Sequence, residues 1–122
     1  MASKKYGYVI TETAEADTDE TFEYIAGDLA NPYAASDFAD ELEKKIDEIC
    51  KAPKTGRLVE NEYLKRNDVR RILVGNYIVY YIIDDEARNI VILRLVYGKR
   101  DQDEILKSSR NTDYHRNGMQ TD

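Results

Sequence analysis

Apolar residues recur along this chain with two different periods, and the changes of period divide it into elements. The first residues are apolar at every second position, which predicts a strand over residues 6–10. Residues 16–30 then carry Phe22, Ile25 and Leu29 at helical spacing. Acidic residues crowd the start of this segment, where the helix dipole favours negative charge. The pattern therefore predicts a strand followed by a helix.

Residues 31–51 show the clearest helical pattern. Asn31 is a favourable N-cap, Pro32 suits the first helical position, and Pro53 ends the helix because it disfavours helical geometry at the residue before it. The apolar stripe consists of Ala35, Phe38, Ala39, Leu42, Ile46 and Ile49. Two helices joined by about two residues must pack antiparallel, so these segments predict a helical hairpin.

Residues 56–68 are polar and irregular and predict a loop. Three apolar runs follow this loop, and β-branched and aromatic residues dominate them. The strands that they predict span residues 69–74, 77–83 and 90–97. Their short connections, Gly75-Asn76 and the polar residues 84–89, predict an antiparallel meander. Residues 101–110 predict a short C-terminal helix, and the polar residues 111–122 predict a flexible tail.

Together these elements predict an α+β fold in the order β-α-α-β-β-β. An N-terminal strand joins a mainly antiparallel sheet, and the antiparallel helical hairpin packs on one face of that sheet. We expect the other face to be open to a partner. Alternation along the central strand places Tyr81 on one face and Tyr80 on the other. We expect one domain over residues 1–110, followed by the tail over 111–122.

Composition and charge narrow the class of protein. The chain has 122 residues, 42% hydrophobic and 34% charged, as expected of one globular domain. A single cysteine excludes an internal disulfide, and no stretch approaches the ~20 apolar residues of a membrane span, so we expect a cytoplasmic protein. The net charge of −6 is uneven: residues 11–50 hold 13 acidic and 2 basic residues, and residues 51–110 hold 13 basic and 9 acidic. This asymmetry disfavours nucleic-acid binding over the whole surface but permits a local basic face.

Few residue types point to catalysis. The single histidine, His115, falls in the expected tail, which disfavours a histidine-dependent triad or metal site. Cys50 follows the apolar stripe of the long helix and is expected to be a small apolar filler. The six glycines are scattered and form no phosphate-binding loop. We therefore predict no metal and no cofactor.

Basic residues of the predicted sheet are the remaining candidates: Arg70, Arg71, Arg94, Lys99 and Arg100. Arg94 and Arg100 share one parity on the last strand, so both would point into the same concavity if that face is open. Alternatively, Arg94 pairs with a carboxylate such as Asp84 or Glu86. The neighbouring tyrosines either pack the sheet or, where exposed, suit base stacking or a protein interface.

Three stretches carry a resemblance to a known family. They are "NPYAASDFADELEKKIDEICKAPKTGRLV" for the long helix and its exit, "VRRILVGNYIVYYII" for the central hairpin and "VILRLVYGKRD" for the last strand. In this order and spacing, the chain resembles the RelE/ParE superfamily of toxins from type II toxin–antitoxin systems, from Tyr8 to about Leu106. The pattern NP-x-AA followed by P-x-x-GR is more similar to the ParE-type branch.

This resemblance implies a helical hairpin on an antiparallel sheet and one of two activities. RelE-like members enter the ribosomal A site and cleave mRNA, whereas proteins similar to ParE bind DNA gyrase and block it. In both branches a cognate antitoxin neutralises the toxin by wrapping its helices and sheet. The resemblance thus implies an antitoxin partner, with either gyrase or the ribosome and its mRNA as the target.

Under the nuclease interpretation, the resemblance implies that Arg100 is catalytic together with Arg70 or Arg71. The chain departs from that branch, because Ile78 stands where RelE-like enzymes carry an arginine and Leu106 where they carry a catalytic tyrosine. Losing one cation at a charged transition state costs about 3 kcal/mol. We therefore predict a toxin that binds and inhibits an essential target such as DNA gyrase, with a ribosome-dependent mRNA endonuclease as the alternative. The residues expected to contact the target or the antitoxin are Arg94, Lys99, Tyr80, Phe22 and Phe38.

Overall fold

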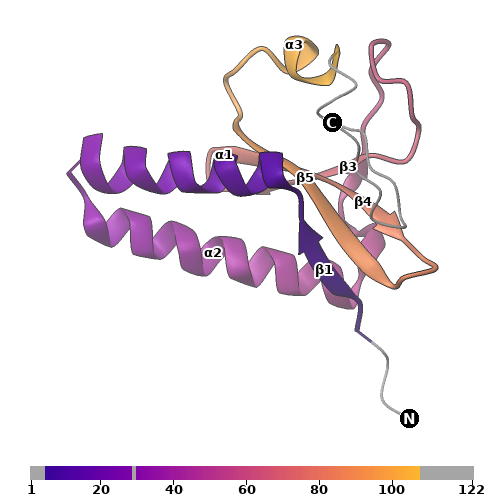
Figure 1. Cartoon of the computed structure of the whole chain (residues 1–122), viewed down its shortest axis with the longest axis horizontal. Helices are drawn as coiled ribbons and strands as arrows, with labels where there is room; N and C mark the ends of the chain where they lie inside the picture. The colour runs from indigo at the N-terminus through magenta and orange to yellow at the C-terminus, as the bar shows by residue number, and fades with distance from the viewer. Residues whose placement is uncertain (1–4, 29, 108–122) are drawn as a thin grey trace.

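The computed structural model describes residues 5–28 and 30–107 as a sheet with helices on both sides (Figure 1). The predicted tail over 111–122 lies outside the described residues. The strands are β1 (Gly7–Ile10), β2 (Arg57–Leu58), β3 (Arg70–Val74), β4 (Tyr77–Asp84) and β5 (Asn89–Tyr97). The helices are α1 (Glu12–Glu23), continued by a π-helical segment (Tyr24–Asp28), α2 (Pro32–Lys51), a 3-10 turn (Pro53–Thr55) and α3 (Gln102–Lys107).

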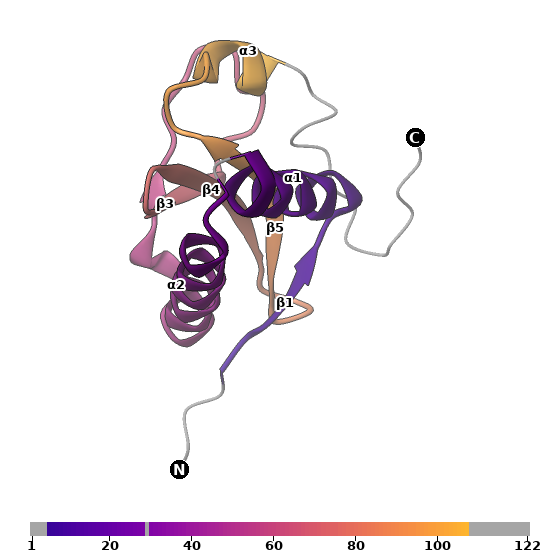
Figure 2. The ribbon, with the colours of Figure 1, turned by 90° about the vertical axis from the view of Figure 1, so that its left-hand side faces the viewer.

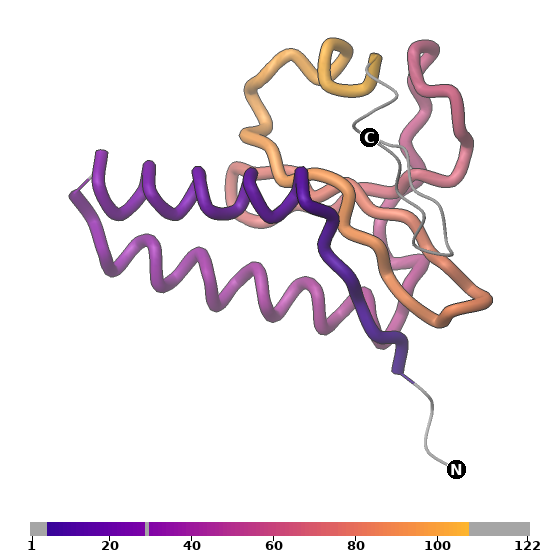
Figure 3. Tube along the Cα trace, viewed as in Figure 1, coloured from indigo at the N-terminus to yellow at the C-terminus, as the bar shows by residue number. Residues whose placement is uncertain are grey.

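The five strands form one sheet in the order β1-β5-β4-β3-β2. β1 runs parallel to β5, and the other neighbouring pairs are antiparallel. Gly75, with φ of +59°, turns the chain between β3 and β4, a conformation that glycine adopts without steric cost. The predicted α+β fold with a mainly antiparallel sheet is therefore confirmed. The tube in Figure 3 follows the chain from β1 into the hairpin and back through the meander.

Local capping signals fix the helical hairpin. The Asn31 side chain accepts a hydrogen bond from the Ala34 N–H at 3.0 Å and starts α2, as predicted. The predicted start of the first helix at residue 16 was wrong, because α1 begins at Glu12. Thr11 caps it by accepting a hydrogen bond from the Ala14 N–H at 3.1 Å. The strand-like alternation of apolar residues runs up to Ile10, directly before this cap, so the apolar pattern did not reveal where the helix begins.

One hydrophobic core lies between the hairpin and the sheet. The apolar stripe of α2 supplies Ile46 and Ile49 to this core, with Phe38 and Leu42 packed against it. Tyr81 enters the same core from β4, and Tyr80 lies on the other face, which confirms that alternation separates the two side chains. Burial of this stripe holds α2 against the sheet, because apolar side chains contribute about 1.5–3 kcal/mol each when fully buried.

The opposite sheet face is covered, so the expectation of an open face was wrong. A second buried cluster forms there around Tyr80, Leu93 and Val96. Ile105 and Leu106 of α3 belong to this cluster and supply part of its cover. In Figure 2, α3 lies across the sheet from α2. The sequence pattern missed this layer because a helix of six residues is too short to show a periodic stripe.

The connection from α2 to the sheet is held by a buried hydroxyl. Tyr81 Oη donates to the Pro53 carbonyl at 2.7 Å and accepts from the Gly56 N–H at 2.9 Å. A Cβ atom on Gly56 would lie 2.5 Å from that oxygen and 2.8 Å from the Arg71 carbonyl, so only glycine fits here. This turn leads into β2, a two-residue strand inside the segment that the sequence predicted to be a loop.

Replacing Tyr81 with phenylalanine is expected to lower the free energy of unfolding by about 1–3 kcal/mol, because two backbone groups lose their partner. Burial raises the pKa of the Tyr81 hydroxyl above its ordinary value of 10.0. Above about pH 10 the unfolded chain therefore ionises first, and the advantage of wild type over Tyr81→Phe shrinks as the pH rises. Urea denaturation at pH 7 and pH 10.5 measures both effects, with exposed Tyr8→Phe as the control.

None of the described helices is both long enough and apolar enough to cross a membrane.

Candidate functional site

A groove of about 790 Å³ runs between the outer end of the helical hairpin and the turn end of the sheet. We call it the acidic groove. Glu20, Glu23 and Asp28 line it from α1 and the π-helical segment. Residues of β4 and β5 form the facing wall, with the side chains of Tyr77, Leu95 and Tyr97 on the hairpin side of the sheet. Arg100 lines the same groove from the loop after β5.

The acidic wall follows from the helical spacing of α1. Residues 17, 20 and 24 recur at three- and four-residue intervals, so one helix face presents Asp17, Glu20 and Tyr24 to the groove. The helix then widens into the π-helical segment, which continues this wall with Ile25 and Asp28. Such π-helical turns are rare and frequently occur at functional sites.

A buried ion pair joins α1 to the sheet beneath this groove. Arg94 Nε and Nη2 donate to the two carboxylate oxygens of Asp17 at 2.7 and 3.0 Å, and the Leu95 N–H donates to Asp17 Oδ2 at 3.0 Å. Arg94 is only 9% exposed. The prediction that Arg94 pairs with a carboxylate is confirmed, but the partner is Asp17 in place of Asp84 or Glu86. β1 pairs with β5 only as far as Ile92, so Asp17 takes over the strand edge that β1 leaves open.

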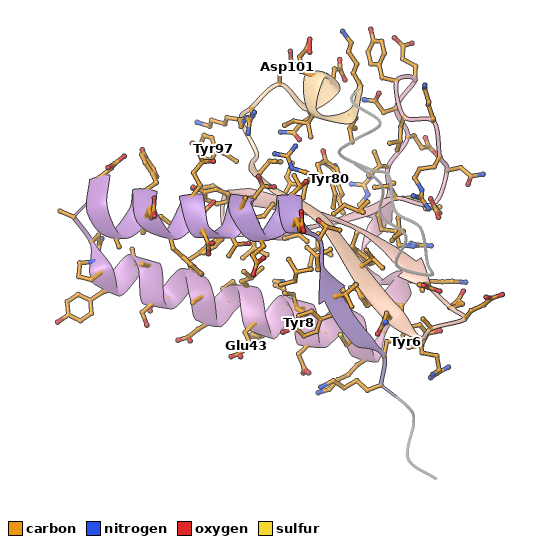
Figure 4. The ribbon with its side chains drawn as sticks, in the orientation of Figure 1. Tyr6, Tyr8, Glu43, Tyr80, Tyr97 and Asp101 are labelled. Atoms are coloured by element: carbon orange, nitrogen blue, oxygen red, sulfur yellow. The ribbon has the colours of Figure 1, made fainter. Side chains whose placement is uncertain are left out.

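An aromatic chain crosses from the hairpin to the groove. Phe22 and Phe38 pack with ring centroids 5.8 Å apart, Phe38 packs on Tyr77 at 5.1 Å, and Tyr77 packs on Tyr97 at 5.5 Å. Phe22 and Phe38, both predicted to bind a partner, thus contact each other and are half-buried. Tyr97, labelled in Figure 4, stays 39% exposed at the groove.

Gln102 fixes the loop that carries Lys99 and Arg100. Its side-chain amide donates to the carbonyls of Tyr97, Gly98 and Arg100 at 2.9 to 3.4 Å. Its Oε1 accepts from the Tyr80 hydroxyl at 2.8 Å. Tyr80 is a predicted binding residue, and here it is a buried anchor between the sheet and α3. Both cations of the loop remain exposed.

A second groove, of about 640 Å³, lies on the α3 side of the sheet. We call it the arginine groove. Arg57 and Arg71 are directly opposite each other on β2 and β3, and Arg71 is opposite Tyr80 on β4. Leu106 closes one side of it. Arg57 was not among the predicted site residues, because its strand of two residues lies in a stretch without period-2 alternation.

The predicted catalytic cations do not gather in one place. Arg70 donates to the Gly56 carbonyl at 2.7 Å on the hairpin side of the sheet, opposite Tyr81. Arg71 lines the arginine groove, and Arg100 lines the acidic groove. Burial raises the pKa of the Tyr80 hydroxyl beside Arg71, so this group stays protonated and gives up its proton reluctantly.

In the described part of the chain, no three side chains of histidine, cysteine, aspartate or glutamate lie close enough together to hold a metal ion.

Comparison with known proteins assigns the family. The model of the family described as "ParE toxin of type II toxin-antitoxin system, parDE" matches residues 8–102, which include both helices of the hairpin and all five strands except the first residue of β1. The chain belongs to the ParE toxin family. This result confirms the resemblance to the RelE/ParE superfamily. No curated protein matches the chain significantly.

Two solved structures share the fold of this ParE-family toxin. One is the chromosomal ParDE toxin–antitoxin system from P. aeruginosa, at 17% identity and a TM-score of 0.62, covering 80% of this chain and all of that chain. The other is the toxin–antitoxin complex RelBE2 from Mycobacterium tuberculosis, at 23% identity and a TM-score of 0.56, covering 77% of this chain and 99% of that chain. Both solved structures thus share the fold described above.

Proposed function

We propose that this ParE-family toxin acts by binding and inhibiting an essential protein target such as DNA gyrase, without cleaving RNA. The observation that carries the proposal is the separation of Arg100 from both Arg70 and Arg71, one of which a nuclease would need beside Arg100. Transition-state stabilisation of a phosphodiester requires preorganised positive charge at one point. Three cations distributed over two grooves and two sheet faces do not provide it.

Two further residues support inhibition over cleavage. Ile78 and Leu106 occupy the positions where the nuclease branch carries an arginine and a tyrosine, and both are buried in the α3-side cluster. Neither side chain can donate a proton or stabilise charge. The match to the ParE family model over residues 8–102 agrees with this choice.

We also propose that a cognate antitoxin neutralises the toxin. The two similar structures are a toxin–antitoxin system and a toxin–antitoxin complex, which supports a protein partner of this kind.

The arginine groove favours one alternative, a ribosome-dependent mRNA endonuclease. Arg57 and Arg71 are like charges directly opposite each other, an arrangement that a bound anion such as phosphate would stabilise. Tyr80 beside them would be the available proton donor, but its hydroxyl is buried and donates to Gln102. In this alternative, Arg71 would be the residue nearest to the scissile phosphate.

Inducing the protein without its antitoxin, while following plasmid supercoiling and mRNA integrity, separates the two functions. We expect altered supercoiling with intact mRNA. Codon-positioned cuts in translated mRNA, with supercoiling unchanged, would contradict the proposal.

Arg71→Ala gives a second test of the same choice. Removing one donor to a charged transition state typically lowers the rate 10²–10³-fold, so a nuclease would lose nearly all its toxicity. We expect growth inhibition by Arg71→Ala to match wild type, because no hydrogen bond or ion pair joins its guanidinium to another described residue and the proposed function gives it no catalytic role. Growth curves at matched protein levels measure this. A loss of toxicity in a variant that still folds would favour the nuclease.

A further inference from the structure

The acidic groove has the shape and floor of a docking site rather than of a solvated helix face. Its volume of about 790 Å³ falls in the range of ligand-binding clefts. Ile25 and Leu95 give it an apolar floor, and two tyrosine rings stand at its surface. Tyr24 is 48% exposed and Tyr97 39% exposed. Exposed tyrosines beside an apolar floor are typical of protein interfaces.

The charge of the groove selects the kind of partner. Asp17 is neutralised by Arg94. Glu20, Glu23 and Asp28 make no ion pair with any described residue, and among the described residues Arg100 is the single cation that lines the groove. Three carboxylates against one guanidinium leave the groove with a net charge of −2. A nucleic-acid backbone or an acidic segment would be repelled from it.

We propose that the acidic groove binds a cationic peptide segment of a protein partner, in which lysine or arginine side chains flank one aromatic or aliphatic anchor. The anchor would fill the floor between Ile25 and Leu95. The basic side chains would pair with Glu20, Glu23 and Asp28. The proposal deepens the function given above and takes from it only that the partner is a protein.

Selection from a phage-displayed library of random 12-residue peptides on the purified full chain tests this chemistry. We expect enriched peptides to carry at least two basic residues within four positions of an aromatic or aliphatic residue. Their binding should weaken as salt rises from 50 to 500 mM. Enrichment of acidic or uncharged peptides would overturn the proposal.

Charge reversal locates the binding. In Glu20→Lys/Glu23→Lys, the dissociation constant of the selected peptide should rise at least tenfold, and in Glu20→Gln/Glu23→Gln it should rise by less. The matched control is Asp40→Lys/Glu43→Lys, with the same spacing on exposed positions of α2. Glu43 points away from the hairpin in Figure 4. The control should bind within twofold of wild type.

Two results would contradict the site. An equal loss of affinity in the α1 and α2 variants would mean that the peptide is attracted by the overall negative charge of the chain and does not bind in the acidic groove. Self-association of the wild type that is lost in Glu20→Lys/Glu23→Lys, measured by sedimentation, would make a second copy of the chain the occupant. Peptide binding is measured on the isolated toxin, so failure to inhibit gyrase would refute the proposed function and leave this inference standing.

Discussion

Replacing Asp17 with alanine is expected to lower the free energy of unfolding by about 3–5 kcal/mol, the usual cost of removing one partner of a buried ion pair. The variant leaves the Arg94 guanidinium, 9% exposed in the fold, without its carboxylate. It also removes the acceptor of the Leu95 N–H at the edge of β5. Both groups were desolvated against Asp17, so neither regains its hydration fully while the chain stays folded.

Urea denaturation of wild type and Asp17→Ala measures this loss. Glu41→Ala is the matched control, because Glu41 pairs with Lys45 at 4.0 Å on the solvent side of α2. An exposed pair of this kind contributes less than about 1 kcal/mol. The double variant Asp17→Ala/Arg94→Met should recover part of the loss, because it removes the stranded charge. A loss below 1 kcal/mol in Asp17→Ala would show that this pair does not hold α1 on the sheet.

Phe38→Ala is expected to lower the free energy of unfolding by about 3 kcal/mol, the low end for a buried phenylalanine because this ring is half-buried. Phe38 is the middle ring of the aromatic chain, in contact with Phe22 of α1 and Tyr77 of β4. Its removal leaves a gap where three elements meet. The acidic groove, which Tyr77 lines, should then lose its rigid wall.

Thermal and urea unfolding measure the change in stability, and Tyr33→Ala provides the control. Tyr33 also lies on α2, near its start, and is 83% exposed. Its loss should therefore change the free energy of unfolding by less than about 0.5 kcal/mol. Equal effects of the two variants would show that aromatic contact at position 38 is not what holds the hairpin to the sheet.

The elements with long apolar periods were predictable from the sequence. The stripe from Ala35 to Ile49 identified α2 and its buried face, and Asn31 and Pro53 marked its ends. Three runs of β-branched and aromatic residues identified the meander. In each case many side chains repeat the same signal, so local preference and tertiary burial agree.

Elements set by a single contact could not be predicted. β2 consists of two residues, and its place depends on the Tyr81 hydroxyl that holds Gly56. The parallel pairing of β1 with β5 brings together residues about 80 positions apart, which no local pattern records. α3 covers the sheet through Ile105 and Leu106, too few residues to reveal a period.

The candidate site was predictable only as a set of residue types. The basic residues of the sheet were identified, but their grouping depends on strand faces and on the β-bulge opposite Tyr80 and Tyr81. For Arg94 the sequence left a concavity and a carboxylate partner open, and it could not identify that partner as Asp17, 77 positions away. The acidic wall was visible only as the charge imbalance of residues 11–50, because the sequence does not show which of those carboxylates share a groove.

The most direct test of the central claim is a supercoiling assay with purified components. The full chain, without antitoxin, is titrated into DNA gyrase, relaxed plasmid and ATP, and a parallel reaction contains translating ribosomes with a defined mRNA. The proposed function predicts that supercoiling falls as the toxin concentration rises, while the mRNA stays full-length at every concentration. Undiminished supercoiling together with mRNA cleaved at the ribosomal A site would contradict it.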